Sequence, residues 1–198
     1  MFHGWAIVGW TALAVAAATA SVLADGVSEA ALHALLRTTA ETSLGFFLLA
    51  FVASALHRAV RARWTAWLLA NRRQLGVSMA VSHGVHGWAI GMLSGWSWLG
   101  YWRLAGPVTA IAGGLGFLML ALMVATSFDV TAAWIGPRAW ARLHTVGVHF
   151  LWFIFFVTLA PGVVESPARV VPVGLLLATL AVRLRWPVRR PVLPRPPS

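Results

Sequence analysis

The sequence predicts an all-α integral membrane protein, folded as a six-helix transmembrane bundle with both the N- and C-termini in the cytoplasm. Of the 198 residues, 60% are hydrophobic and 10% are charged, and the mean hydropathy is +0.79. This composition lies far outside the range of soluble globular domains. Apolar runs of about 20 residues, the length that crosses a bilayer, recur along the chain. The arginines gather in alternate connections between those runs.

Each expected transmembrane helix is an apolar run that ends at a polar, glycine-containing or proline-containing connection. The six expected helices cover residues 5–23, 43–56, 75–93, 107–127, 140–159 and 170–184. The outer end of the second helix can extend back to residue 38. No basic residue precedes the first run, so we expect a retained helix rather than a cleaved signal peptide.

Two further segments carry local signals. Tryptophan, leucine and arginine alternate over residues 63–71, which predicts a short helix at the membrane interface. The glycine-rich run at 113–116 predicts close contact between the fourth helix and a neighbour. We expect one transmembrane domain, residues 1–186, followed by a disordered tail rich in proline and arginine, residues 187–198. Such an organisation leaves no room for a flavin or nucleotide domain, which takes upwards of about 100 residues.

The distribution of arginine predicts the orientation in the membrane. All 15 basic residues are arginines, and most lie between the second and third helices, between the fourth and fifth, or after the sixth. Arg37, Arg103 and Arg169 lie on the opposite side. The arginine-rich side should be cytoplasmic. We therefore assign the net charge of +10 to topology and lipid headgroups, and expect the lipid bilayer as a partner and no nucleic acid.

Four histidines lie inside two of the expected transmembrane helices. His83 and His86 are in the third helix, and His144 and His149 are in the fifth. Polar side chains at that depth are costly and usually functional. Four neutral nitrogen ligands without a neighbouring carboxylate predict the iron ligands of a b-type haem. His83 and His86 share one helix face, whereas His144 and His149 point about 140° apart. Depth favours His83 or His86 paired with His149.

Other interpretations of these polar residues stay open. A zinc site would normally add a carboxylate or a fourth close ligand, and a histidine inside a helix can serve packing alone. His144 lies nearer the cytoplasm and could share a second haem with His57. Arg72 and Arg73 are topology signals, and they could also bind haem propionates or an acidic partner surface. The absence of cysteine excludes disulfides and thiolate-bound iron–sulfur clusters.

Two motifs resemble the ferric reductase-like transmembrane domain family. The branch that looks closest is the haem-binding membrane subunit of the bacterial methionine-sulfoxide reductase system. The first motif is Arg-Arg-Gln-Leu-Gly at 72–76, followed after nine residues by His86. The second is Trp-Ala-Arg-Leu-His at 140–144, which matches the Trp-x-x-Leu-His pattern of the family. The similarity covers roughly residues 40–160.

The resemblance implies a b-type haem held between the third and fifth helices of a protein in the bacterial inner membrane. His86 and His144 match the family ligands. Val157 stands where the family has another histidine in the fifth helix, and Arg72 stands where the oxidase branch has one in the third. Because neither two-haem pair is complete, we expect one haem rather than two.

The expected function is that of a membrane electron carrier, an oxidoreductase subunit without its own nucleotide or flavin domain. Electrons would come from a separate cytoplasmic flavoprotein or from membrane quinol, and would leave to an acceptor on the outer side. A haem-less scaffold or assembly subunit is one alternative, which Val157 favours. A small transporter is another, although no acidic residue lies in the middle of an expected helix, where ion pathways normally use such groups.

Overall fold

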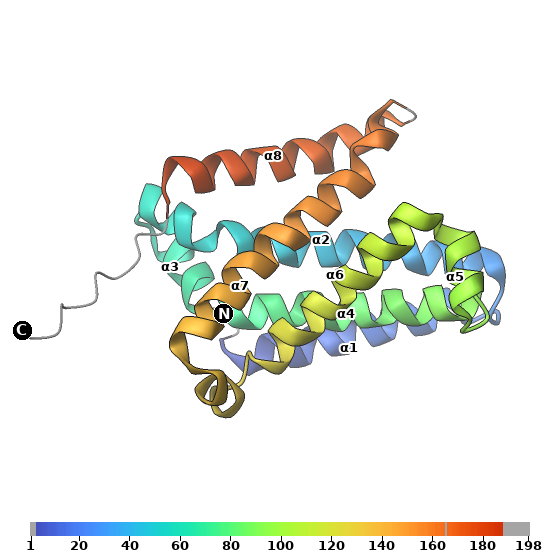
Figure 1. Cartoon of the computed structure of the whole chain (residues 1–198), viewed down its shortest axis with the longest axis horizontal. Helices are drawn as coiled ribbons and strands as arrows, with labels where there is room; N and C mark the ends of the chain where they lie inside the picture. The colour runs from blue at the N-terminus through green and yellow to red at the C-terminus, as the bar shows by residue number, and fades with distance from the viewer. Residues whose placement is uncertain (1–2, 165, 188–198) are drawn as a thin grey trace, which may run out of the picture.

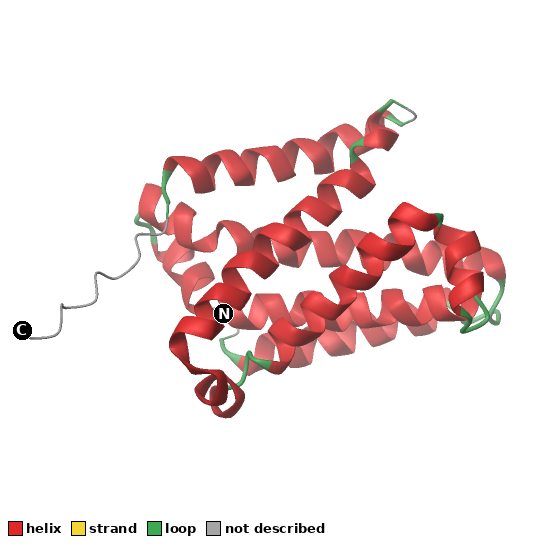
Figure 2. Ribbon diagram, viewed as in Figure 1, coloured by secondary structure: helices red, strands yellow, loops and turns green. Residues whose placement is uncertain are grey.

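The computed structural model describes residues 3–164 and 166–187, and all regular secondary structure in these residues is helical (Figure 1, Figure 2). The all-α prediction is confirmed. The elements are α1 (Trp5–Val22), α2 (Glu29–Ala59), α3 (Arg63–Ala70), α4 (Arg72–Leu93), α5 (Trp98–Ala105), α6 (Pro107–Ala125), α7 (Asp129–Leu159), the 3-10 turns Pro161–Val163 and Pro167–Arg169, and α8 (Val170–Arg185). The expected disordered tail falls, apart from Pro187, outside the described residues.

Among the described residues, five helical stretches are long and apolar enough to cross a membrane. They are α1, α2, α6, α7 with the turn that follows it, and α8 with the turn that precedes it. These stretches have the character of a multi-pass membrane protein. The third expected span corresponds to α4, which is 22 residues long. It is less apolar than the other long helices because it contains histidines and serines. The count of six spans therefore stays a prediction, as does the orientation.

The long helix α2 lies at the centre of the molecule. It packs along α4 on one side and against α8 on the other, while α1 covers α4 and α6 packs against α7 (Figure 1). The helices α2 and α4 are antiparallel, because Thr39 contacts His86 while Ser54, further along α2, contacts Arg72. The largest buried cluster gathers around Phe47 and Phe51 of α2.

Two helices begin earlier than their hydropathy indicates. The second span was expected over 43–56, but α2 starts at Glu29, where the Ser28 side chain accepts a hydrogen bond from the Ala31 amide. Its first turns carry polar residues, which an apolar pattern does not detect. The fifth span was expected over 140–159, but helix α7 starts at Asp129. It is broken at Gly136 (φ 76°, ψ 162°), just before Pro137, because no helical backbone has that φ.

Short helices lie at both ends of the bundle. The helix expected over 63–71 is present as α3, and the Thr65 hydroxyl, which donates to the Val60 carbonyl, fixes its first turn. The helix α5 was not expected from the sequence. The glycine-rich run in α6 permits close packing, as predicted: a Cβ at Gly113 would lie 2.6 Å from the Tyr101 hydroxyl.

Asn71 joins the start of the chain to the turn between α3 and α4. Its Oδ1 accepts a hydrogen bond from the Gly4 amide (2.8 Å), its Nδ2 donates to the Trp67 carbonyl (2.8 Å), and the side chain is buried. Asn71→Ala should lower the free energy of unfolding by about 1–3 kcal/mol, because it removes the hydrogen-bond acceptor of the partly buried Gly4 amide. Thr158→Val, at an exposed hydroxyl, is the control. Equal denaturation of the two variants in detergent would contradict this role.

Candidate cofactor-binding cavity

The helix α7 crosses in front of α2 and α4 (Figure 1), and a cavity of about 1520 Å³ lies between these helices, α6 and α8. Pockets for small molecules are typically about 300–1,000 Å³, so this one can hold a large ligand. Phe47, Phe51, Leu120 and Leu180 contribute apolar walls. Gly76 of α4 also lines the cavity, and a Cβ built there would meet nothing within 4 Å.

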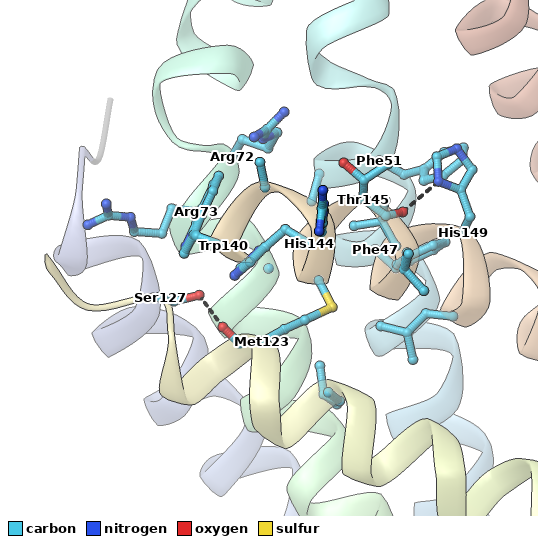
Figure 3. Close-up of a pocket in the computed structure, with 18 of the residues that line it drawn as sticks. Phe47, Phe51, Arg72, Arg73, Met123, Ser127, Trp140, His144, Thr145 and His149 are labelled. Atoms are coloured by element: carbon cyan, nitrogen blue, oxygen red, sulfur yellow. Dashed lines mark hydrogen bonds between the residues drawn. The ribbon is translucent and has the colours of Figure 1, made fainter. Parts of the chain in front are cut away.

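Four of the six predicted site residues line this cavity. His144 and His149 reach it from α7, and Arg72 and Arg73 reach it from the first turn of α4 (Figure 3). The other two, His83 and His86, do not line it. In the described part of the chain, no histidine of α4 makes a ring contact with a histidine of α7.

A hydrogen bond within α7 fixes the ring of His149. Its Nδ1 lies 2.7 Å from the carbonyl oxygen of Thr145, one turn earlier in α7 (Figure 3). A carbonyl only accepts, so Nδ1 carries the proton and Nε2 carries the free lone pair. Metal-binding histidines are commonly held in this way. The edge of the ring packs on Phe51, with 5.8 Å between ring centroids and 77° between planes.

His144 has the opposite tautomer. Its Nε2 lies 3.1 Å from the hydroxyl of Thr126 on α6, and that hydroxyl already donates to the Leu122 carbonyl. The imidazole must therefore donate from Nε2. Trp140 stacks on the ring with 4.2 Å between centroids, and its indole donates to the Thr126 carbonyl. His144 thus faces α6 whereas His149 faces α2, in agreement with the predicted angle between them. A metal could bind the Nε2 of His144 only if the bond to Thr126 were broken.

His83 and His86 stack on each other further along α4. Their ring centroids are 5.0 Å apart and their planes differ by 11°. His86 Nδ1 donates to the Leu36 carbonyl and the Thr39 hydroxyl of α2, both at 3.1 Å. Two stacked rings on one helix cannot lie on opposite sides of one iron, so either would need a partner from another helix.

The ring of His83 packs among aromatic side chains. It contacts Phe117 of α6 (centroids 4.8 Å) and Phe155 of α7 (6.2 Å). Its Nδ1 is buried without a hydrogen-bond partner. Phe155 also packs on Phe47, so aromatic rings fill the space between His83 and the cavity. Within the described residues, no group of three or more histidine and acidic side chains could hold a metal ion, which leaves the zinc alternative without a candidate cluster.

The cavity is strongly basic. Arg73 forms an ion pair with Asp129 (2.8 Å), whereas Arg72, among the described residues, donates a hydrogen bond to the neutral Ser54 hydroxyl (2.7 Å). Three further arginines line the cavity: Arg138, Arg142 and Arg183. No acidic side chain is among the described lining residues. From the sequence, these three arginines were assigned to topology alone. The spacing of four between Arg138 and Arg142, continued by 145 and 149, could have placed these two arginines on the His149 face of α7.

His57 lies outside this cavity. Its Nδ1 contacts the Thr65 hydroxyl at 2.9 Å, which ties the end of α2 to α3. Thr65 already donates to the Val60 carbonyl, so His57 donates and has a structural role here. The structure therefore does not bring His57 to the cavity that His144 lines.

Comparisons of the chain with protein-family models, with curated proteins and with solved structures find no match. The resemblance to the ferric reductase-like family therefore rests on the two sequence motifs. In the structure, the first residues of one motif and the last histidine of the other, Arg72 and His144, line the same cavity.

The hydrogen bonds predict different tautomers for the two cavity histidines. At a pH of about 8.5, where imidazoles are neutral, ¹⁵N spectra of the histidine-labelled protein should show His149 protonated on Nδ1 and His144 on Nε2. His149→Gln and His144→Gln assign the signals. Thr126→Val should change the His144 signal alone. A His149 signal typical of Nε2 protonation would contradict the described geometry.

Proposed function

We propose that this protein is a multi-pass protein of the bacterial inner membrane that binds one b-type haem in the cavity and carries electrons across the membrane. The observation that carries the proposal is the composition of the cavity. It combines two imidazoles, apolar walls and four arginines that no carboxylate neutralises, among the described residues. A haem requires a ligand for its iron, an apolar environment for its porphyrin ring and cationic partners for its two propionates.

The side chains that line the cavity fit a haem. The free Nε2 of His149 would hold the haem iron, and the bond from its Nδ1 to Thr145 fixes the ring. Arg72, Arg138 and Arg142 can pair with the propionates. Gly76 leaves the α4 wall open for close approach of a flat ring. A bound haem would supply one-electron chemistry, and the protein would supply its ligand, its orientation and a dry apolar shell.

The orientation follows from the arginines. The cavity lies at the arginine-rich ends of the helices, which the positive-inside rule places in the cytoplasm together with both termini. The electron donor is then a separate cytoplasmic flavoprotein or membrane quinol, and the acceptor lies on the outer side. His83 and His86 lie about 16–21 Å along α4 from Arg72, toward that outer side.

Haem loading of the purified protein tests the proposal. Protein in detergent mixed with hemin should bind about one haem per chain, with a Soret band that shifts on dithionite reduction. His149→Ala should weaken binding at least about tenfold, because it removes the imidazole that would hold the iron. His33→Ala, at an exposed histidine outside the cavity, is the matched control. A protein that stays colourless with hemin would refute haem binding.

Gly76 offers a second test of the same site. Gly76→Leu should reduce haem binding by about tenfold or more while thermal stability is kept, because position 76 lines the cavity and a Cβ there meets nothing within 4 Å. Gly84→Leu, two turns further along α4, is the control, since that Cβ also meets nothing within 4 Å. Equal haem binding by both variants would place the haem elsewhere.

A haem-less scaffold or assembly subunit is the second candidate. One observation favours it: the structure brings no imidazole of α4 against an imidazole of α7 in the described residues, and Val157 and Arg72 replace two family histidines. Under this alternative, replacing His83, His86, His144 and His149 together by alanine leaves the absorption spectrum unchanged.

A further inference from the structure

One face of α2 holds a row of three arginine side chains at the inner end of the bundle. Arg183 of α8 donates to the carbonyl of Phe51 (2.7 Å), and Arg72 of α4 donates to the hydroxyl of Ser54 (2.7 Å). Arg58 belongs to α2 itself. Positions 51, 54 and 58 are three and four residues apart, so they share a face and span about 10 Å of helix. Three guanidinium groups from three helices therefore lie along two turns of α2.

Among the residues that the structure describes, no carboxylate neutralises this row. Arg58 donates to the carbonyl of Trp186 from Nε (3.2 Å) and Nη2 (2.5 Å), so all three arginines have neutral oxygen acceptors. Among the described acidic residues, Asp129 is paired with Arg73, and the other three, Asp25, Glu29 and Glu41, lie toward the opposite end. Neighbouring like charges that are partly withdrawn from water are costly without a counter-charge.

The guanidinium groups keep donors for a ligand. Each has five N–H groups, and the bonds above use two in Arg58 and one each in Arg72 and Arg183. Arg183 is held further by Phe51, whose ring centroid lies 4.5 Å from its Cζ. Such fixed, forked donors match the oxygens of a phosphate group.

The surroundings favour a lipid over a free anion. Leu184, 71% exposed, Leu177 and Val60 present apolar surface near this end of α8 and α2, where acyl chains can lie. Trp186, at the end of α8, is the kind of residue that marks the headgroup level. Basic pockets between transmembrane helices on the cytoplasmic side bind anionic lipid headgroups.

We propose that the Arg58–Arg72–Arg183 row binds the phosphate group of an anionic phospholipid from the inner leaflet. The lipid joins α2, α4 and α8 by supplying the negative charge that the described residues do not provide. Arg72 and Arg183 also line the cavity, whereas Arg58 does not. The lipid is expected to bind the haem-free protein.

Thermal unfolding of the haem-free protein tests this site. In detergent, added phosphatidylglycerol should raise the Tm by about 5 °C, whereas phosphatidylcholine should leave it unchanged. The shift should shrink in about 0.5 M NaCl, because salt screens the charges. Equal shifts with both lipids, or an equal shift with inorganic phosphate, would overturn the assignment to an anionic lipid.

Variants locate the site. Arg58→Gln should lose most of the shift with phosphatidylglycerol, and Arg103→Gln, at the opposite end, should keep it. Arg183→Gln should likewise lose most of the Tm shift. If Arg183→Gln fails to fold, the Tm shift of Arg58→Gln and mass spectrometry of the lipid that co-purifies with it test the site. Wild-type lipid content and Tm shift in Arg58→Gln would overturn the proposal. Haem binding by Arg58→Gln should equal wild type, which separates this site from the cavity.

Discussion

The close packing of α2 against α4 is the contact on which the rest of the arrangement depends. Lipid chains are as apolar as leucine, so helices within a bilayer associate through close van der Waals contact and hydrogen bonds between helices. Ser43, Ser78 and Ser82 are each 0% exposed, which lets the two backbones approach. The Ser82 hydroxyl donates to the Thr39 carbonyl across the contact. With this pair fixed, α8 and α1 pack at its sides, and α7 crosses it and leaves the cavity.

The parts of the fold that the sequence predicts well are those that lipid would surround. The helices α1, α6 and α8 match the predicted apolar runs within about two residues. Hydropathy indicates which residues are apolar enough to contact lipid, but it does not indicate at which residue the backbone hydrogen bonds of a helix begin or end. For that reason it missed the first turns of α2, which are helical and polar. It also missed the segment before Gly136, where the backbone turns within a continuous apolar stretch.

The candidate site, like the fold, could be predicted only in part from the sequence. Imidazole side chains are energetically costly in an apolar helix, and for this reason the sequence indicated the four histidines as functional candidates. Helical geometry predicted that His144 and His149 point in different directions. Which helices face one another depends on side-chain packing that periodicity does not encode. The placement of Phe155 against His83, and of Arg183 of α8 at the cavity, could be seen only in the folded chain. The pairing of His86 with His149 stays a prediction.

The turn at Gly136 has a consequence for how α7 fits its surroundings. An unbroken helix of 31 residues would measure about 46 Å, far more than the hydrocarbon thickness of about 30 Å. The break leaves a straight portion from Pro137 to Leu159 of about 34 Å, close to that thickness. The residues before the break are free to lie along the membrane surface, with Trp134 80% exposed. The turn at this glycine thus shortens the helix to about the hydrocarbon thickness, so α7 does not need to tilt to avoid a hydrophobic mismatch. The angle between α7 and the membrane normal is then set by packing against neighbouring helices.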